Sequence, residues 1–284
     1  MRDDFAVFIL SHGRPDRIFT LKSLEKGNYT GKTYIVIDDE DKTAGEYYER
    51  YGEDVLMFSK KKYDGFFDIG DNMNDRRVVV YARNAIWDIA EELGLTYFCV
   101  LDDDYTDFMY RIEDEKKGVL KAYQCKQLDR LFDEMLLFLE KSGANTICFA
   151  QGGDYIGGTN SRVYKEKLSR KAMNSWFFKT DRRFKFVGRI NEDVNTYVYL
   201  SNKGQLFFTL AYVSVNQPIT QTNAGGLTDI YVDQGTYLKS FYSVMYAPQA
   251  VKISQMGWVN YRIHHRVCWN NCTPLILNEK YRKY

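Results

Sequence analysis

The sequence predicts an α/β domain with a mainly parallel central sheet, and three observations support that prediction. Short apolar runs alternate with amphipathic stretches through the first 150 residues, a pattern typical of sheets covered by helices. Polar residues follow directly after several of these runs, where ligands of such sheets bind. The chain has 284 residues, 45% of them hydrophobic, which is enough to bury one large core. We therefore expect a single domain over residues 1–284, with an elaborated C-terminal half.

The elements of the first half are expected in a regular order. Strands are expected at Phe5–Leu10, Tyr34–Ile37, Val55–Phe58, Tyr97–Leu101 and Thr146–Ala150. Helices are expected at Asp16–Leu24, Glu46–Tyr51, Val80–Leu93 and Leu128–Leu139. The third of these helices has its apolar residues at helical spacing and is followed by Gly94, a common helix stop. Residues 63–75 are rich in Gly, Asp and Asn without periodicity, which indicates a loop.

The second half gives fewer signals. Leu206–Val215 is strand-like, and Val259–Val267 alternates as a closing strand would. Between them, Thr220–Thr228 is rich in amide and hydroxyl groups, as a sugar-recognition loop would be. After it come the residues of a candidate stacking wall for a flipped base: Tyr231, Tyr237, Lys239, Phe241 and Tyr242.

Three consecutive carboxylates, Asp102 to Asp104, follow the fourth apolar strand. Like charges this close raise one another's pKa, so such a cluster usually persists because a cation binds in it. Residues i and i+2 of a strand point the same way, so Asp102 and Asp104 are candidates to share one Mg²⁺ or Mn²⁺. The alternative is an acidic turn without a ligand.

Three strand ends carry polar groups, and in a parallel sheet they meet at one edge. The groups are Ser11 to Arg14, Asp38 with Asp39, and the three aspartates. This arrangement predicts a nucleotide site. No Gly-x-x-x-x-Gly-Lys-Ser/Thr loop and no Gly-x-Gly-x-x-Gly is present, which argues against P-loop enzymes and dinucleotide-binding domains.

Charge divides the chain unequally. Residues 1–150 carry 21 Lys and Arg against 30 Asp and Glu, a net −9, and residues 151–284 carry 18 against 8, a net +10. The densest basic stretch has six cationic residues that we expect to contact nucleic acid: Arg162, Lys171, Lys179, Arg182, Arg183 and Lys185. The aromatic residues among them are candidates for base stacking: Tyr164, Trp176, Phe177, Phe178, Phe184 and Phe186. The alternative is a solvated surface over buried aromatics.

In chain order, four motifs resemble the landmarks of GT-A glycosyltransferases. They are Asp-x-Asp at Asp102–Asp104, a glycine-containing acceptor loop at Gln151–Gly158, x-Glu-Asp at Asn191–Asp193, and a metal histidine at His264 or His265. The segments Ser11–Asp16, Tyr81–Ala85, Leu101–Thr106 and Arg262–His265 are further similar to the TET-associated glycosyltransferases. Those phage enzymes add sugars to hydroxymethylated pyrimidines in DNA and are akin to the glucosyltransferase that makes base J. The resemblance covers essentially the whole chain.

The resemblance implies a GT-A, Rossmann-like fold and a metal-dependent transfer of a sugar from a UDP-sugar to a hydroxyl acceptor. The expected acceptor is a hydroxymethylated pyrimidine, such as hydroxymethylcytosine, in phage DNA. Residues 1–150 would bind the nucleotide sugar and residues 151–284 the acceptor. The donor-binding residues implied are Ser11, Gly13, Arg14, Asp38 or Asp39 for the base and ribose, and Arg83 for the diphosphate. Asp102 would contact the ribose or the metal, Mn²⁺ or Mg²⁺, and Asp104 would ligate the metal.

Catalysis with inversion needs a base that deprotonates the acceptor hydroxyl. Asp193 is the candidate, with Glu192 orienting the acceptor or the sugar, although a retaining enzyme would not use Asp193 in this way. Because adjacent strand residues face opposite ways, we expect only one of His264 and His265 to bind the metal. A zinc site that adds Cys268 and Cys272 is an alternative, but its spacing matches no common pattern.

Two other functions remain open from the sequence. One is a nucleic-acid-binding module with a structural acidic cluster, and the other is a sugar nucleotidyltransferase, which would be expected to have a more glycine-rich first loop. No apolar stretch approaches the roughly 18 residues of a membrane span, and Met1–Asp4 leads directly into a strand rather than a signal peptide. We therefore expect a cytoplasmic protein, in the host cytoplasm if it is phage-encoded, without a membrane or an obligate protein partner.

Overall fold

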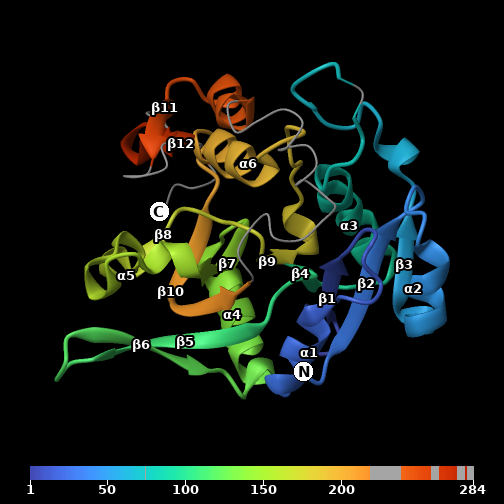
Figure 1. The fold of residues 1–284 in the computed structure, drawn as a ribbon, viewed down its shortest axis with the longest axis horizontal. Helices are drawn as coiled ribbons and strands as arrows, with labels where there is room; N and C mark the ends of the chain where they lie inside the picture. Colours follow the sequence, from blue (N-terminus) through green and yellow to red (C-terminus); the bar gives the residue numbers. More distant parts are fainter. Residues whose placement is uncertain (74, 218–237, 257–261, 274–278, 280–284) are drawn as a thin grey trace.

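The computed structural model describes residues 1–73, 75–217, 238–256, 262–273 and 279, and their strands form a large central sheet (Figure 1). The strands are β1 Phe5–Leu10, β2 Lys32–Asp38, β3 Val55–Phe58, β4 Tyr97–Asp102, β5 Asp107–Asp114, β6 Val119–Gln124, β7 Thr146–Gln151, β8 Leu168–Ser169, β9 Trp176–Lys179, β10 Phe207–Asn216, β11 Val251–Met256 and β12 Arg262–Val267. The α-helices are α1 Phe19–Lys26, α2 Ala44–Tyr51, α3 Val80–Glu92, α4 Leu128–Ser142, α5 Arg162–Glu166 and α6 Glu192–Ser201, and residues 238–246 are also helical.

The order of the main sheet is β3-β2-β1-β4-β9-β7-β10-β5-β6, with β8 paired to β10. The first four strands are parallel neighbours, and β7 is parallel to β10. Strand β9 runs antiparallel between β4 and β7, so those two strands also share a direction. The predicted α/β architecture with a mainly parallel sheet is therefore confirmed.

The core lies on both faces of this sheet because successive strand residues point to opposite sides. In β1, Ala6, Phe8 and Leu10 pack on the face covered by α3 and α6. The alternate residues of β1, from Phe5 to Ile9, pack on the face covered by α1 and α4. Cys99 and Cys148 are fully buried, as expected for core thiols.

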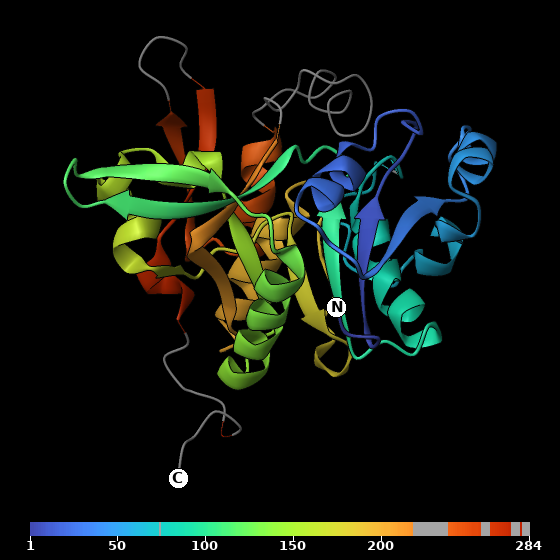
Figure 2. The same ribbon diagram turned by 90° about the horizontal axis from the view of Figure 1, so that it is seen from below.

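Each strand and helix predicted in the first half is present, and the loop at residues 63–75 has no long element. Helix α1 begins at Phe19 rather than at Asp16, because the chain first turns through a hydrogen bond from Arg17 N to Arg14 O. The β5–β6 hairpin, which projects from one end of the sheet in Figure 2, was not predicted. Its residues are mostly half-exposed or exposed on both faces, so they lack the apolar alternation that marks a strand.

The expected stacking role of the aromatic residues between 164 and 186 is wrong. Trp176, Phe177 and Phe178 form the inner strand β9 and are fully buried. Tyr164, Phe184 and Phe186 are buried as well. An interior position, rather than a nucleic-acid surface, therefore explains this aromatic run.

The C-terminal segment also differs from the prediction. Strand β12 pairs with β11 in a separate two-stranded antiparallel sheet instead of closing the main sheet. Residues 259–261 of the predicted strand, the loop Thr220–Thr228, and Tyr231 and Tyr237 lie outside the described residues. Tyr242, the last residue of the expected stacking wall, is buried in the core. No helix within the described ranges is long and apolar enough to cross a membrane.

Candidate functional site

The carboxyl ends of β1, β2 and β4 meet at one edge of the sheet, as the sequence predicted. Leu10 pairs with Val36 on one side and with Asp102 on the other. The segments that follow these strands are therefore neighbours.

Asp103 fixes the first loop to the end of β4. Ser11 Oγ donates to Asp103 Oδ2 at 2.6 Å, and Arg14 Nη2 lies 3.2 Å from Asp103 Oδ1. Burial raises the pKa of Asp103, and the nearby Arg14 opposes that rise. With both oxygens occupied by protein groups, Asp103 positions the loop.

Asp102 is bound by a buried arginine. Arg83 of α3 donates from Nη2 to Asp102 Oδ1 at 2.7 Å, and its Nε lies 3.8 Å from Glu192 Oε1. The arginine side chain is 1% exposed, and within the described part of the chain neither Nε nor Nη1 has a hydrogen-bond partner. The sequence analysis gave Arg83 a diphosphate partner, whereas in the structure this guanidinium joins the Asp-x-Asp motif to the Glu-Asp motif.

Asp104 differs from both of its neighbours. Burial, followed by repulsion from Asp102 and Asp103, raises the pKa of Asp104 to about 7. Its Oδ1 is buried and has no hydrogen-bond partner among the residues that the structure describes. A buried carboxylate oxygen that lacks a hydrogen bond and lies among other negative charges is a suitable ligand atom for a hard divalent cation.

A complete protein cage for a metal is nevertheless absent from the part of the chain that the structure describes. No three His, Cys, Asp or Glu side chains there are arranged to hold a metal ion. The expected set of two aspartates and a histidine is therefore not assembled, nor is the alternative zinc site that would add Cys268 and Cys272. Mg²⁺ commonly takes one or two carboxylates and completes its shell with water and substrate phosphates, so Asp104 still fits a metal of that kind.

Glu192 and Asp193 begin helix α6, and both are buried. The residue before them, Asn191, has φ +56°, and its side-chain amide donates to Lys239 O at 2.7 Å. Burial, then the charge of Asp193, raises the pKa of Glu192 to about 8, and burial also raises the pKa of Asp193. The pair therefore holds protons more tightly than ordinary carboxylates, as an acid–base group requires.

The two histidines do not separate as the sequence analysis expected. Their ring centroids lie 4.3 Å apart, so His264 and His265 are close neighbours rather than residues on opposite sides of β12. His265 Nδ1 lies 3.5 Å from Asn191 Nδ2, beside the start of α6. Burial, then the neighbouring His264, lowers the pKa of His265 to about 3, so its ring is neutral at physiological pH. A neutral imidazole is the form that binds metals.

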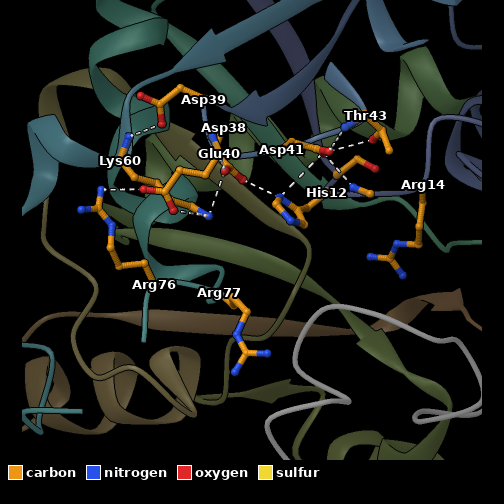
Figure 3. Close-up of polar contacts among 12 residues, drawn as sticks. His12, Arg14, Asp38, Asp39, Glu40, Asp41, Thr43, Lys60, Arg76 and Arg77 are labelled. Carbon is orange, nitrogen blue, oxygen red and sulfur yellow. Dashed lines mark hydrogen bonds and ion pairs between the residues drawn. The ribbon is translucent and has the colours of Figure 1, made fainter. Parts of the chain in front are cut away.

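Asp38 and Asp39 have different environments. Asp39 is exposed and accepts a hydrogen bond from Lys60 N at 3.0 Å. Asp38 is buried, with Oδ2 2.7 Å from His12 Nδ1 and Oδ1 2.9 Å from Lys60 Nζ (Figure 3). Although burial opposes it, these two hydrogen bonds hold the pKa of Asp38 below its usual value. Gly13, another predicted donor residue, donates from N to Asp41 Oδ2 at 2.7 Å.

His12 lies in the Ser11–Arg14 loop that was expected to hold the base and ribose, but Asp41 and Lys60, which complete this cluster, were not predicted. Lys60 follows β3 in a segment read only for its strand, so no sequence signal pointed to its burial. The analysis also missed Arg189, which is fully buried with Nε 2.7 Å from Asp71 Oδ2. That ion pair attaches the loop at residues 63–75 to the segment preceding α6.

The six predicted nucleic-acid-binding residues do not form one surface. Lys179 pairs with Tyr97 at the amino end of β4, at the edge of the sheet opposite Asp102. Arg182 donates to the carbonyls of Leu139 and Ala144. The other partners are Asp88 for Arg183, Phe66 O for Lys185, Glu166 for Arg162 and Asp154 for Lys171. Only Lys171 lies near the candidate site, since its charge lowers the pKa of both Asp193 and His265.

Comparison with known proteins gives one family match. The model of the TET-Associated Glycosyltransferase family matches residues 5–226. No curated protein sequence is significantly similar to the chain.

Solved structures similar to the chain include two that contain UDP and a divalent metal ion. Glucosyl-3-phosphoglycerate synthase from Mycobacterium tuberculosis, in complex with Mg²⁺ and UDP, has a TM-score of 0.46 and 8% identity, over 93% of this chain and 87% of that one. GalNAc-T7 with UDP, GalNAc and Mn²⁺ has a TM-score of 0.42 and 10% identity, over 86% of this chain and 51% of that one.

Proposed function

The chain belongs to the TET-associated glycosyltransferase family, and on that premise we propose that it transfers a sugar from a UDP-sugar to the hydroxymethyl group of a modified pyrimidine in phage DNA. Binding of a metal and a nucleotide sugar is supported chiefly by Asp104, which lies in an acidic cluster and whose buried Oδ1 has no hydrogen-bond partner in the described ranges. Asp104, with Asp102 beside it, would hold Mg²⁺ or Mn²⁺, and water and substrate phosphates would complete the shell of such an ion. When bound, such a metal supplies positive charge that stabilises a departing diphosphate.

Other residues of the chain would position the metal ligands and the nucleotide. Arg83 holds Asp102 in place and carries positive charge toward Glu192. Ser11, Gly13 and Arg14 line the nucleotide side of the edge through their bonds to Asp103, Asp41 and Tyr47. These contacts support a site that is ordered before the donor binds.

We assign Asp193 as the base of an inverting reaction. Its raised pKa makes the ionised carboxylate a stronger proton acceptor than an ordinary aspartate. The acceptor oxygen forms a bond to the anomeric carbon as the bond to the diphosphate breaks, and the hydroxyl proton passes to Asp193. Glu192, with a pKa of about 8, is protonated at neutral pH and is suited to donate a hydrogen bond to the acceptor or the sugar.

The net positive charge of the C-terminal half supports a polyanionic acceptor such as DNA, although the six predicted nucleic-acid-binding residues do not form one surface. Residues 151–284 carry a net charge of +10. Around α5, Lys165 and Lys167 are exposed, and no carboxylate in the described ranges lies within salt-bridge distance of either. Lys167 Nζ lies 3.5 Å from the ring centroid of Tyr164 and 5.2 Å from that of Tyr212. Cations beside an exposed aromatic ring such as Tyr212 suit a nucleic-acid backbone.

The proposal is tested by mass spectrometry of DNA that contains hydroxymethylcytosine. The DNA is incubated with the protein, Mn²⁺ and a panel of sugar nucleotides, and the expected product is heavier by one glycosyl unit per modified base. Unmodified DNA and the Asp193→Asn variant serve as controls. If the protein turned over a UDP-sugar without changing the mass of the DNA, the UDP-sugar would stand as the donor and hydroxymethylcytosine in DNA would be excluded as the acceptor.

A further inference from the structure

A buried charge cluster lies beside the nucleotide edge, and its charges do not balance without His12. Asp38, Asp41 and Lys60 have side chains 7%, 1% and 4% exposed. Two buried carboxylates therefore face one buried ammonium group. Buried charges require compensation, so the cluster favours one further positive charge.

His12 is placed to supply that charge. Its Nδ1 lies 2.7 Å from Asp38 Oδ2 and 3.7 Å from Asp41 Oδ2, so the ring stands between the two carboxylates. The hydrogen bond to Asp38 outweighs the effect of burial and raises the pKa of His12, and Lys60 acts in the opposite direction. Arg14, two residues along the same loop, pairs with Asp103 instead.

The carboxylates themselves have little capacity left for a ligand. Asp38 Oδ1 accepts from Lys60 Nζ and from Glu40 N, and its Oδ2 is taken by His12. Asp41 accepts from the amide groups of Gly13 and Thr43 and from the Thr43 hydroxyl. A base that binds here therefore meets hydrogen-bond donors rather than free acceptors.

The exposed part of the cluster is the imidazole ring. The side chain of His12 is 43% exposed, and its polar contacts with the described residues are made through Nδ1. In Figure 3 the ring extends from the strand ends to the same side as the side chains of Arg14 and Arg77. Nε2–H is thus available on the open side while Nδ1 is anchored.

We propose that His12 is the residue that recognises the nucleobase of the donor, by presenting Nε2–H to a carbonyl oxygen of uracil while Asp38 and Asp41 hold the ring from behind. This inference rests on the proposed use of a uridine-diphosphate sugar. It gives Asp38 a positioning role behind His12, in place of the direct contact with the base or ribose that the sequence analysis expected. A carbonyl-bearing base is selected because the contact needs an acceptor.

The test is a titration of the full-length protein with UDP, followed by NMR of the imidazole nitrogens. The chain has three histidines, so the His12 signals are assigned by their loss in His12→Gln. We expect UDP and uridine to shift the Nε2 resonance of His12, and inorganic pyrophosphate to leave it unchanged. A shift caused by pyrophosphate alone would assign His12 to the phosphates and overturn the proposal.

Calorimetry adds a second readout. A charge-assisted hydrogen bond predicts about a tenfold loss of UDP affinity in His12→Gln at pH 6.5. Imidazolium is lost as pH rises through its raised pKa, so the wild-type affinity should fall toward that of the variant by pH 8.5. Titration of UDP itself affects both proteins equally and cancels in their ratio.

The possible outcomes distinguish a failure of the role proposed for His12 from a failure of the proposed function. UDP binding with unchanged His12 signals and a ratio independent of pH would overturn the role of His12 and leave the proposed function standing. Absence of UDP binding to the wild-type protein, with or without Mn²⁺, would overturn the proposed function and this inference together. The decisive titration uses the wild-type protein, and His12→Gln is needed only to assign the signals, so weakened UDP binding by the variant does not prevent the test.

Discussion

Replacement of Asp104 by asparagine is expected to stabilise the metal-free protein while removing its metal-dependent binding of UDP. The pKa of Asp104 is about 7, compared with a usual 3.8, so the folded state holds this proton more tightly than the unfolded chain. The gap of roughly three pH units corresponds to about 4 kcal/mol at most. Because solvent reaches part of the carboxylate, we take about 2 kcal/mol, which predicts a rise in Tm of roughly 4–6 °C.

The pH dependence follows from the sign of that shift. Between about pH 4 and pH 7 the folded state binds more protons than the unfolded state, so the ionisation of Asp104 lowers stability progressively as pH rises. The penalty is complete above pH 7, and Asp104→Asn removes it. The gain in Tm should therefore be larger at pH 8 than at pH 5.

The assay is thermal unfolding in the presence of EDTA at both pH values, paired with calorimetry of UDP binding in Mn²⁺. Asp107→Asn is the matched control, because Asp107 lies just beyond the cluster in β5 and forms only an exposed ion pair with Lys26. We expect that control to change neither Tm nor binding appreciably. Equal gains in Tm at the two pH values, or unaltered Mn²⁺-dependent binding of UDP by Asp104→Asn, would refute the reasoning.

Three further predictions follow from the same contacts. Arg83→Lys should lower the free energy of unfolding in urea by about 3 kcal/mol, because a lysine cannot serve both carboxyl groups that the buried guanidinium joins, those of half-buried Asp102 and buried Glu192. Asp193→Asn should reduce kcat by about 10²–10⁴-fold with the calorimetric affinity for UDP retained, and full activity would remove its role as a base. Lys167→Glu should lower the salt dependence of DNA binding by about one in log–log slope, whereas Arg182→Glu, which loses bonds to the end of α4, should lower Tm and leave the slope unchanged. If instead Arg182→Glu lowered the slope and Lys167→Glu did not, the DNA-binding surface would lie near Arg182, at the opposite edge of the sheet.

The first half of the fold was predictable because its signals are local. Apolar runs such as Phe5–Leu10 and the helical spacing of α3 depend only on neighbouring residues. Strand β9 was missed since its aromatic residues lie within a basic stretch, and charge there was read as a surface property. Nothing local distinguishes an aromatic run that stacks on bases from one that is buried between β4 and β7.

The location of the candidate site was predictable from the sequence, but the hydrogen-bond and ion-pair partners of its side chains were not. Strand ends of a parallel sheet meet at one edge, so the convergence of Ser11, Asp38 and Asp102 followed from topology. The partner of each carboxylate depends on residues far along the chain, such as Lys60 behind Asp38. The expectation that His264 and His265 face apart used an ideal pleat, from which β12 departs enough for the two rings to lie together.

The position of β9 in the sheet has a consequence for how the chain reaches its folded state. Residues 176–179 fill the gap between residues 97–102 and 146–151, so the first 150 residues by themselves would leave β4 and β7 with unpaired inner edges. Pairings between such distant segments raise the contact order and slow folding. During synthesis the sheet of the first 150 residues therefore cannot be completed until residues 176–179 have been made. A fragment truncated before residue 176 should expose the unpaired edges of β4 and β7 and aggregate.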